Sequence, residues 1–324
     1  MERRGLPSSL LAALTSLLVL SACVTQSMAP SEPGASASAS VSPSVVSASP
    51  SPIESMPPTP PTVTLLAVGD IGSCDGLADE SVAALAVDLI GATQGVVALL
   101  GDTVYPKGTT AEFDACFDPA WQPIFSRLRP VPGNHEYETP AATGYFDEFA
   151  NLLPGDRGAG WYAYQHGDWL ILALNSNCEA IGGCGPDSPQ YRWLAERLAA
   201  DNSNCVLAYW HHPRYSSGRH GSDDLTEPLW SLLADAGADL VLSGHDHTYE
   251  RFAPIDGIRQ FVVGTGGRSL YPFEGEPLPQ TEARADDTYG LLQLSLEPGG
   301  YAWRFVPATD VGGSFTDVGD AACH

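Results

Sequence analysis

Polar residues that can bind metal ions follow five short apolar segments of the chain. The segments are TVTLLAVGD (62–70), GVVALLGD (95–102), RLRPVPGNH (127–135), CVLAYWHH (205–212) and ADLVLSGHDH (238–247). Each ends in Asp, Asn or His, whose oxygen and nitrogen atoms suit hard or borderline metal ions. Open α/β sheets bind ligands at the carboxyl ends of their strands. The segments therefore predict buried strands that carry a metal site at their ends.

Each motif taken alone has an ordinary structural explanation. A GD pair after a strand is also typical of a turn, and a lone GNH is typical of a hydrogen-bonded loop. The pair His245 and His247 is more specific, because alternate residues of an extended segment point to the same side. The combination carries more weight, since GDIG, GDTVY, GNHE, YWHHP and GHDH occur in this order.

The segments between these motifs predict the elements that position them. Helical spacing of apolar residues occurs at 78–92, 188–202 and 226–238, and Ser188-Pro189 and Thr226 are suitable helix starts. Alternating patterns at 160–176, 257–267 and 289–308 indicate β-hairpins or meanders. We expect an α/β fold with two packed, mixed β-sheets flanked by helices, which is a four-layer α/β/β/α sandwich.

Composition and charge restrict the partners of the chain. Its 324 residues are 44% hydrophobic, which is enough for a sizeable core. The 15 basic and 39 acidic side chains give a formal net charge of -24. This charge argues against nucleic acid and anionic membrane surfaces as extended partners. A small phosphorylated substrate is compatible with it, because bound metal ions can invert the local electrostatics of a site.

The N-terminal residues predict export. Arg3 and Arg4 precede a short apolar stretch, and Leu20-Ser21-Ala22-Cys23 resembles a lipobox. We therefore expect a signal peptide at 1–22 and a lipid anchor at Cys23, which would be the only link to a membrane. An ordinary cleavable signal is the alternative. Residues 23–62 are rich in Ser, Pro and Ala and predict a disordered tether. The remainder, 63–324, is expected to be one catalytic domain of a cell-envelope lipoprotein or secreted protein.

Cysteine usage agrees with an oxidising compartment. Apart from Cys23, the chain has an even number of cysteines, namely Cys74, Cys116, Cys178, Cys184, Cys205 and Cys323. In an exported chain this favours disulfides, although many pairings are possible. We expect Cys74 to pair with Cys116, Cys178 with Cys184, and Cys205 with Cys323. A thiolate metal site is the competing interpretation, but no close CxxC pair supports it.

The ordered motifs resemble those of the metallophosphoesterase, or calcineurin-like, superfamily. Tyr105 lies three residues after Asp102, which resembles the purple acid phosphatase branch and differs from the GDxVDRG motif of the serine/threonine phosphatases. The segment His247-Thr248-Tyr249-Glu250-Arg251 and the later GTGG add to the likeness. The resemblance extends over about 62–323.

The resemblance implies a role for each motif residue in a dinuclear metal centre. Asp70, Tyr105 and His247 would hold a ferric ion, and Asp102 would bridge both metals. Asn134, His211 and His245 would complete the site of a divalent ion, which is iron, zinc or manganese in this family. His212 would have a supporting or structural role.

Two further histidines match the family's catalytic positions. A metal-bound hydroxide would attack the phosphorus atom of a phosphate ester. His135, next to Asn134, would contact the substrate. His220, nine residues after His211, would assist the leaving group, although it could also be an ordinary loop histidine.

The predicted function is metal-dependent hydrolysis of phosphate monoesters, so the chain would be a phosphoric ester hydrolase. A phosphodiesterase or nucleotidase with the same centre is the alternative. The loops at 136–157 and 268–287 do not indicate which class of ester is preferred. A tethered surface module without catalytic activity is a third hypothesis.

Overall fold

The structure is a computed structural model that describes residues 62–74, 78–91 and 93–324. The predicted signal peptide, Cys23 and nearly all of the predicted tether lie outside these residues. None of the helices in the described ranges is both long and apolar enough to cross a membrane.

The first sheet has six strands in the order β13-β12-β11-β1-β2-β3. Their bounds are β1 (Val63–Val68), β2 (Val96–Leu99), β3 (Leu128–Pro130), β11 (Gly290–Glu297), β12 (Gly300–Pro307) and β13 (Val318–Ala322). β1, β2 and β3 are parallel to one another, whereas β11 pairs with β1 in antiparallel orientation. The polar residues after β1, β2 and β3 therefore emerge at one edge.

The second sheet has seven strands in the order β10-β8-β9-β7-β6-β5-β4. Their bounds are β4 (Tyr162–His166), β5 (Trp169–Ala173), β6 (Cys205–Tyr209), β7 (Leu240–Ser243), β8 (Tyr249–Phe252), β9 (Arg259–Val263) and β10 (Thr281–Ala285). β5, β6, β7 and β9 run parallel, and the outer strands are antiparallel. Both sheets are mixed, as the sequence predicts.

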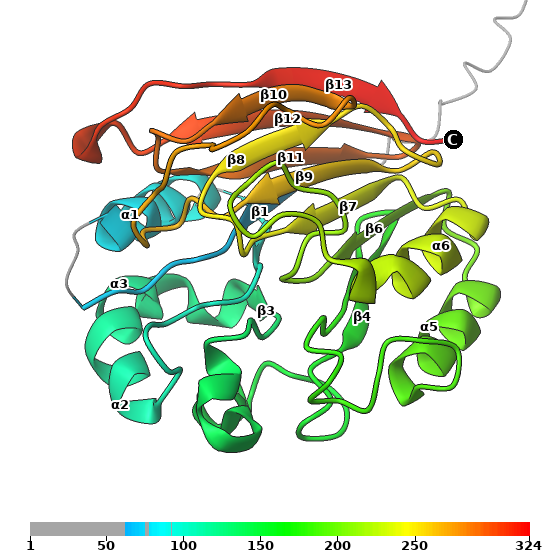
Figure 1. The fold of residues 1–324 in the computed structure, drawn as a ribbon, viewed down its shortest axis with the longest axis horizontal. Coiled ribbons are helices and arrows are strands. Elements are labelled where there is room, and N and C mark those ends of the chain that lie inside the picture. Colours follow the sequence, from blue (N-terminus) through cyan, green and yellow to red (C-terminus); the bar gives the residue numbers. More distant parts are fainter. Residues whose placement is uncertain (1–61, 75–77, 92) are drawn as a thin grey trace, which may run out of the picture. The chain divides into compact units, whose positions relative to one another are not determined.

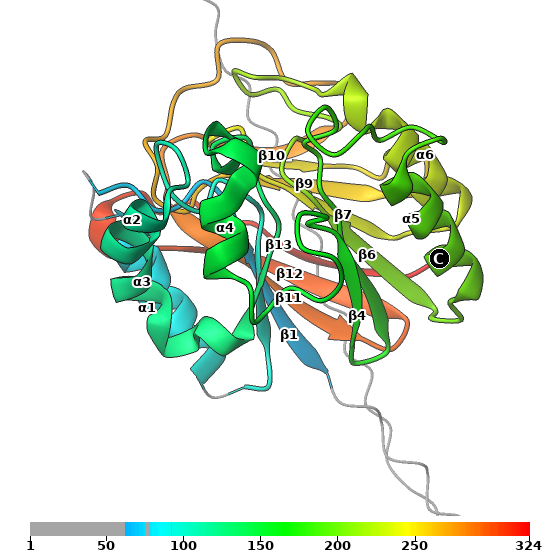
Figure 2. The same ribbon diagram turned by 90° about the horizontal axis from the view of Figure 1, so that it is seen from below.

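Helices cover the outer face of each sheet (Figure 1; Figure 2). The first sheet carries α1 (Ala78–Gly91), α2 (Thr110–Glu112), α3 (Asp118–Trp121) and α4 (Thr143–Glu148), and the second carries α5 (Pro189–Ala200) and α6 (Glu227–Asp235). Short turns of other helix types are η1 (Phe113–Phe117), η2 (Gln122–Arg127), η3 (Glu136–Glu138), η4 (Pro140–Ala142), η5 (Asp224–Thr226) and η6 (Thr309–Val311).

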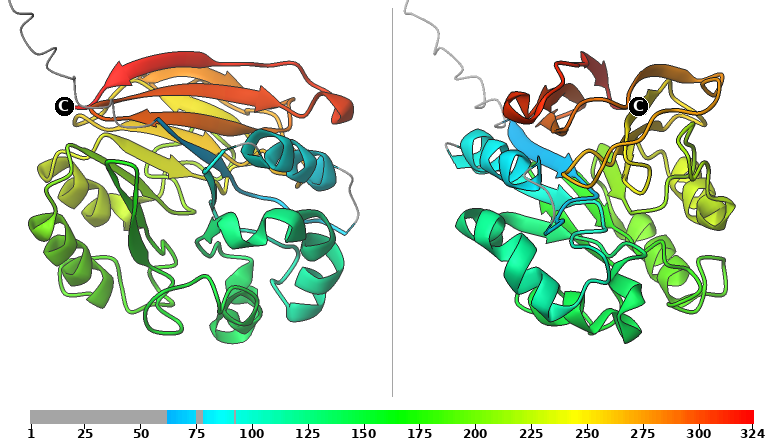
Figure 3. Two further views of the ribbon diagram at one scale, coloured as in Figure 1. Left: turned by 180° about the vertical axis from the view of Figure 1, so that it is seen from behind. Right: turned by 60° about the vertical axis from the view of Figure 1, so that its left-hand side comes forward.

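Successive side chains of a strand point to opposite faces of the sheet, and this alternation divides the buried apolar residues into three clusters. In β1, Leu65 and Ala67 belong to the core between the two sheets, whereas Leu66 and Val68 pack with residues of α1. In β5, Leu170 and Leu172 pack with residues of α5 and α6. Each inner strand is thus buried on both faces, which explains its nearly continuous apolar sequence. The four-layer α/β/β/α architecture is confirmed, and Figure 3 shows the stacked layers from two further directions.

Most predicted elements are present, with two local differences. α5 begins after Ser188, whose side chain accepts a hydrogen bond from the Tyr191 N–H as an N-cap does. α6 begins after Thr226, but the Thr226 hydroxyl donates to the Asp223 carbonyl instead of capping the helix. The segment 257–267 contributes the single strand β9 and is not a hairpin by itself. The other two predicted hairpins are β4 with β5 and β11 with β12.

The three predicted disulfides are all present. They join Cys74 to Cys116, Cys178 to Cys184 and Cys205 to Cys323, with Cα–Cα distances of 4.9, 5.1 and 5.6 Å. The last bridge ties β6 to the segment after β13, so it connects the two sheets across 118 residues of sequence.

Candidate metal centre

Backbone hydrogen bonds continue beyond the strand ends and bring the motif loops together. The Asp70 N–H donates to the Gly101 carbonyl at 3.1 Å, and the Gly244 N–H donates to the His211 carbonyl at 3.0 Å. A third bond, from the Gly69 N–H to the Val263 carbonyl at 2.9 Å, joins the edge of one sheet to the other. The motif loops of both sheets therefore meet at one place.

Three of the predicted ligands have left-handed backbone conformations. The φ angles are 60° at Asp70, 47° at Asp102 and 71° at His245. Residues other than glycine rarely adopt this region, and such conformations cluster at functional sites. Glycines that face Asp70 and Asp102 leave room for these two carboxylates. A Cβ at Gly244 would lie 2.6 Å from Asp70 Oδ2, and a Cβ at Gly133 would overlap Asp102 Oδ1.

One half of the centre is built around the Tyr105 hydroxyl. It lies 3.0 Å from Asp70 Oδ1, 3.0 Å from Asp102 Oδ2 and 3.2 Å from His247 Nε2. Both aspartates are fully or almost fully buried, and Tyr105 is 4% exposed. Four oxygen and nitrogen donors from three separate motifs thus converge on one point.

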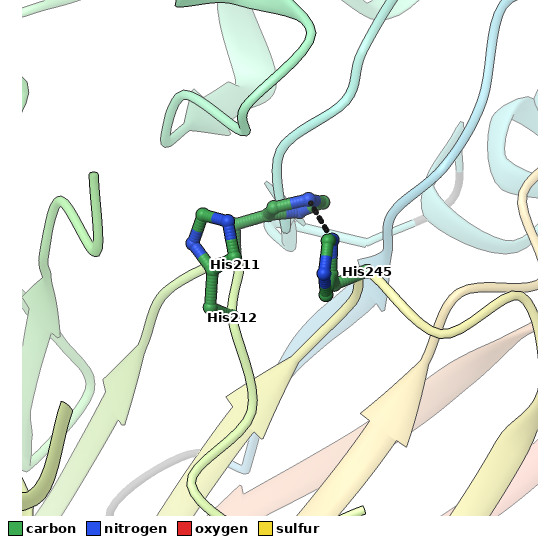
Figure 4. Close-up of side chains that lie close together, drawn as sticks. All are labelled: His211, His212 and His245. Atoms are coloured by element: carbon green, nitrogen blue, oxygen red, sulfur yellow. Dashed lines mark hydrogen bonds between the residues drawn. The ribbon is translucent and has the colours of Figure 1, made fainter. Parts of the chain in front are cut away.

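The other half is formed by two histidines and an asparagine. His211 Nε2 lies 3.1 Å from Asn134 Oδ1, 3.2 Å from His245 Nδ1 and 3.4 Å from Asp102 Oδ2. Figure 4 shows the rings of His211 and His245 beside each other, with His212 adjacent. Asp102 contacts both halves, so it has the position of a bridging residue. The structure brings all seven predicted ligands into one cluster.

The charges in this cluster are unbalanced. Burial raises the pKa of the Asp70 carboxyl to about 8, although attraction from His211 opposes the shift. Burial also disfavours the charge on Asp102, but the attraction and hydrogen bond from His211 hold its pKa below the ordinary value. Burial disfavours a charged His211, yet Asp102 raises the pKa of this imidazole to about 9.

The positive charge of His211 therefore compensates the carboxylate of Asp102, while a second buried carboxylate, that of Asp70, lies beside them. Asp70, Asp102 and His211 each offer a ligand atom within 4.8 Å of the others, a separation that suits an ion between them. Added positive charge would allow both carboxylates to ionise. The donor set thus fits metal ions.

The two predicted catalytic histidines border the cluster. The His135 N–H donates to Asp102 Oδ1 at 2.9 Å, and its ring centroid lies 4.4 Å from that of Tyr105. The His135 side chain is 34% exposed, so a substrate can reach it. The ring of His220 lies 4.4 Å from that of His245. Both imidazoles are therefore close to the predicted ligands.

Sequence reasoning missed Glu136, a fully buried carboxylate next to His135. Its oxygens accept hydrogen bonds from the backbone N–H groups of Asp102, Thr103, Val104 and Gly133, at 3.0, 2.8, 3.3 and 2.6 Å. Burial raises the pKa of Glu136 to about 7, although its backbone hydrogen bonds favour the ionised form. Glu136 holds the GDTVY and GNHE loops against each other. The fourth letter of GNHE is its only signal in the sequence.

Asp246 was also missed, although it lies between His245 and His247. The buried Asp246 carboxylate accepts hydrogen bonds from the His220 N–H at 2.8 Å and from the Tyr271 hydroxyl at 3.1 Å. Tyr271 in turn stacks on the His247 ring, with centroids 4.9 Å apart. Asp246 therefore fixes the His220 loop over the centre.

Comparison with known proteins agrees with this geometry. The sequence pattern of the family described as Calcineurin-like phosphoesterase matches residues 63–249. The chain belongs to the calcineurin-like phosphoesterase family. This match covers the motif segments from GDIG to GHDH.

The curated relatives of this phosphoesterase include acid phosphatases. Human acid phosphatase type 7 is 28% identical over 204 residues, which is 51% of this chain and 46% of that protein. Purple acid phosphatase 15 of Arabidopsis thaliana is 25% identical over 290 residues, 74% of this chain and 51% of that protein. The chain spans about half the length of these two relatives. Both relatives are named as acid phosphatases, which is the class of enzyme that the motifs predict.

Solved structures share the fold of the phosphoesterase. A purple acid phosphatase from yellow lupin (Lupinus luteus) seeds matches with a TM-score of 0.71 and 18% identity, over 81% of this chain and 54% of that chain. A dimetal phosphatase from Danio rerio matches with a TM-score of 0.54 and 14% identity, over 82% of this chain and 100% of that chain.

Replacing Glu136 tests its role in holding the two loops. Glu136→Ala removes the acceptor of four buried N–H groups, so we expect a loss of about 3–5 kcal/mol in the free energy of unfolding, measured by urea denaturation. Glu136→Gln, which keeps the shape and one acceptor oxygen, should fall between that variant and the wild type. The exposed Glu138→Ala is the matched control and should change little. A wild-type unfolding midpoint in Glu136→Ala would contradict this role.

Proposed function

We propose that this phosphoesterase hydrolyses phosphate monoesters at a dinuclear centre of the purple acid phosphatase type. The observation that carries the proposal is the Tyr105 hydroxyl, which lies within 3.2 Å of Asp70, Asp102 and His247. A phenol among carboxylates and imidazole is the donor set that suits a ferric ion. Asp70, Tyr105 and His247 would hold that ion.

The remaining donors define the second position. Asn134, His211 and His245 would hold a divalent ion, which is iron, zinc or manganese in the resembling family, and Asp102, which contacts both halves, would serve both positions. Two metal ions supply an activated water as nucleophile and neutralise the charge of the phosphate oxygens. Glu136 would help to keep the two positions at a fixed separation, because it accepts a hydrogen bond from the Asp102 N–H.

His135 and His220 handle the substrate and its leaving group. Histidine is the side chain that transfers protons near neutral pH, and the departing alkoxide needs a proton. His135 is tied to the centre through its N–H bond to Asp102 and its Nδ1 contact with the Pro106 carbonyl at 2.6 Å. His220 is fixed through its N–H bond to Asp246. We assign substrate contact to His135 and proton donation to His220.

The cellular setting is inferred from the sequence and the disulfides. Three disulfides fit a protein outside the cytoplasm. We propose that residues 1–22 direct export, that Cys23 carries a lipid, and that 23–62 tether the catalytic domain at 63–324. A centre with histidines beside an accessible position favours catalysis over a purely structural metal site, which protein ligands usually close.

Tyr105→Phe tests the identity of the ferric position. The variant lacks the phenolate oxygen, so the visible tyrosinate-to-iron absorption should disappear while some iron stays bound. Tyr271→Phe is the matched control, because the Tyr271 ring stacks on His247 but its hydroxyl contacts neither Asp70 nor Asp102. This variant should keep the colour. Retention of the wild-type spectrum by Tyr105→Phe would exclude Tyr105 as a ligand.

His135→Ala and His220→Ala test the proposed function directly. Each should lower kcat by about 100-fold or more while the metal content stays the same. The loss in His220→Ala should be larger for an alkyl phosphate than for p-nitrophenyl phosphate, because the alkoxide needs the proton more. His324→Ala, whose imidazole contacts Asp239, is the control and should retain activity.

The same assay separates the rival functions. We expect the wild type to hydrolyse p-nitrophenyl phosphate faster than bis-p-nitrophenyl phosphate. A reversed preference would indicate the phosphodiesterase alternative. Metal-loaded protein without activity on either ester would indicate the non-catalytic module.

A further inference from the structure

A groove leads away from the metal centre on the side of His212. Its inner part is a cavity of about 250 Å³ lined by Ser176, His212 and Asp223 among others. Its outer part, of about 330 Å³, continues past the Cys178–Cys184 disulfide to Pro228. Glu179 and Leu225 line both parts, which makes them one continuous depression, here named the His212 groove.

The inner end of the groove adjoins the proposed ligands. The ring centroid of His212 lies 4.9 Å from that of His211 and 4.6 Å from that of His245. The Ser176 Oγ accepts a hydrogen bond from the His212 N–H at 2.9 Å and contacts His212 Nδ1 at 2.8 Å. The serine hydroxyl can then donate its proton to Nδ1. Ser176 therefore fixes the orientation of the His212 ring at the boundary between centre and groove.

The groove also lies on the leaving-group side of the centre. Asp223, which lines it, closes the loop at 213–223 through its N–H bond to the Pro213 carbonyl at 2.8 Å. The same loop carries His220, the proposed proton donor. The rings of His212 and His220 lie 4.6 and 4.4 Å from that of His245, so the inner end of the groove and the proposed proton donor adjoin the same predicted ligand.

The charges around the centre differ between its two sides. The groove is lined by the carboxylates of Glu179 and Asp223, and in its outer part also by Asp224, which forms a salt bridge with Arg214 at 2.9 Å. Leu225, which is 54% exposed, adds an apolar wall.

Two arginines lie near the half of the centre that is built around Tyr105 and His247. The Arg268 Cζ is 5.0 Å from the ring centroid of Tyr105, and the Arg219 Cζ is 5.9 Å from that of Tyr271. An anionic phosphoryl group is attracted toward these arginines, and the groove favours a group without negative charge.

We propose that the His212 groove binds the alcohol portion of the substrate and selects phosphate esters of alcohols that carry an ammonium group over esters of anionic alcohols. This inference rests on the proposed phosphomonoesterase function and names its substrate class.

Two aryl phosphates of equal size test the proposal, one with a trimethylammonium and one with a carboxylate substituent on the ring. The ratio of kcat/KM for the cationic ester to kcat/KM for the anionic ester also reflects the different pKa values of the two leaving groups. The change of this ratio on mutation is therefore the informative quantity. We expect Glu179→Gln to lower the cation-to-anion ratio about fivefold, and Glu179→Lys to lower it further. Leu225→Ala should raise KM for both esters without changing the ratio.

Glu196→Gln removes the same charge from the exposed side of α5, away from the groove, and should leave the ratio unchanged. An unchanged ratio in Glu179→Gln, or an equal change in Glu196→Gln, would overturn the groove assignment while hydrolysis continues. Failure of the wild type to hydrolyse any ester would instead overturn the proposed function, and this inference with it.

Discussion

The close approach of two buried carboxylates determines how the metal centre and its supporting loops are built. Asp70 and Asp102 both contact the Tyr105 hydroxyl at 3.0 Å, in a place where burial opposes the charge on each. Such an arrangement is unfavourable unless cations compensate it. The fold maintains it because the two residues end neighbouring parallel strands and each strand is buried on both faces.

Other buried acids secure the geometry without joining the centre. Glu136 accepts hydrogen bonds from the loops that carry Asp102 and Asn134, and Asp246 does the same for the loop that carries His220. Backbone N–H groups are weak counterparts for a full charge, but several together satisfy a carboxylate and fix a loop. The site thus combines proposed ligands, whose buried charges call for cations, with supporting carboxylates that backbone N–H groups satisfy. The charges around the centre are also unevenly distributed, with Arg268 near Tyr105 and carboxylates in the groove beyond His212.

The sequence predicts the centre better than its supports, for a physical reason. A buried strand followed by Asp70 or Asp102 is a local pattern, and the disulfide pairing agreed with the structure although spacing alone left many choices. The partners of Glu136 and Asp246 depend on loops that meet only after folding. The short helices between Thr110 and Arg127 alternate between helix types and have no steady period to detect. The edge strands β10 and β13 are half-exposed and carry few apolar residues, so their pairing is set by neighbouring strands.

Metal stoichiometry measured together with stability is the decisive test of the dinuclear centre. The domain at 63–324 should be purified, stripped with a chelator and titrated with iron and zinc, with bound metal and Tm followed in the same samples. We expect two metal ions per chain and a Tm that rises as they bind, because they neutralise the buried carboxylates. Asp102→Asn should bind fewer ions, since it removes the bridging charge. A folded chain that binds no metal in excess iron and zinc, with a Tm unaffected by chelator, would contradict a dinuclear centre at this site.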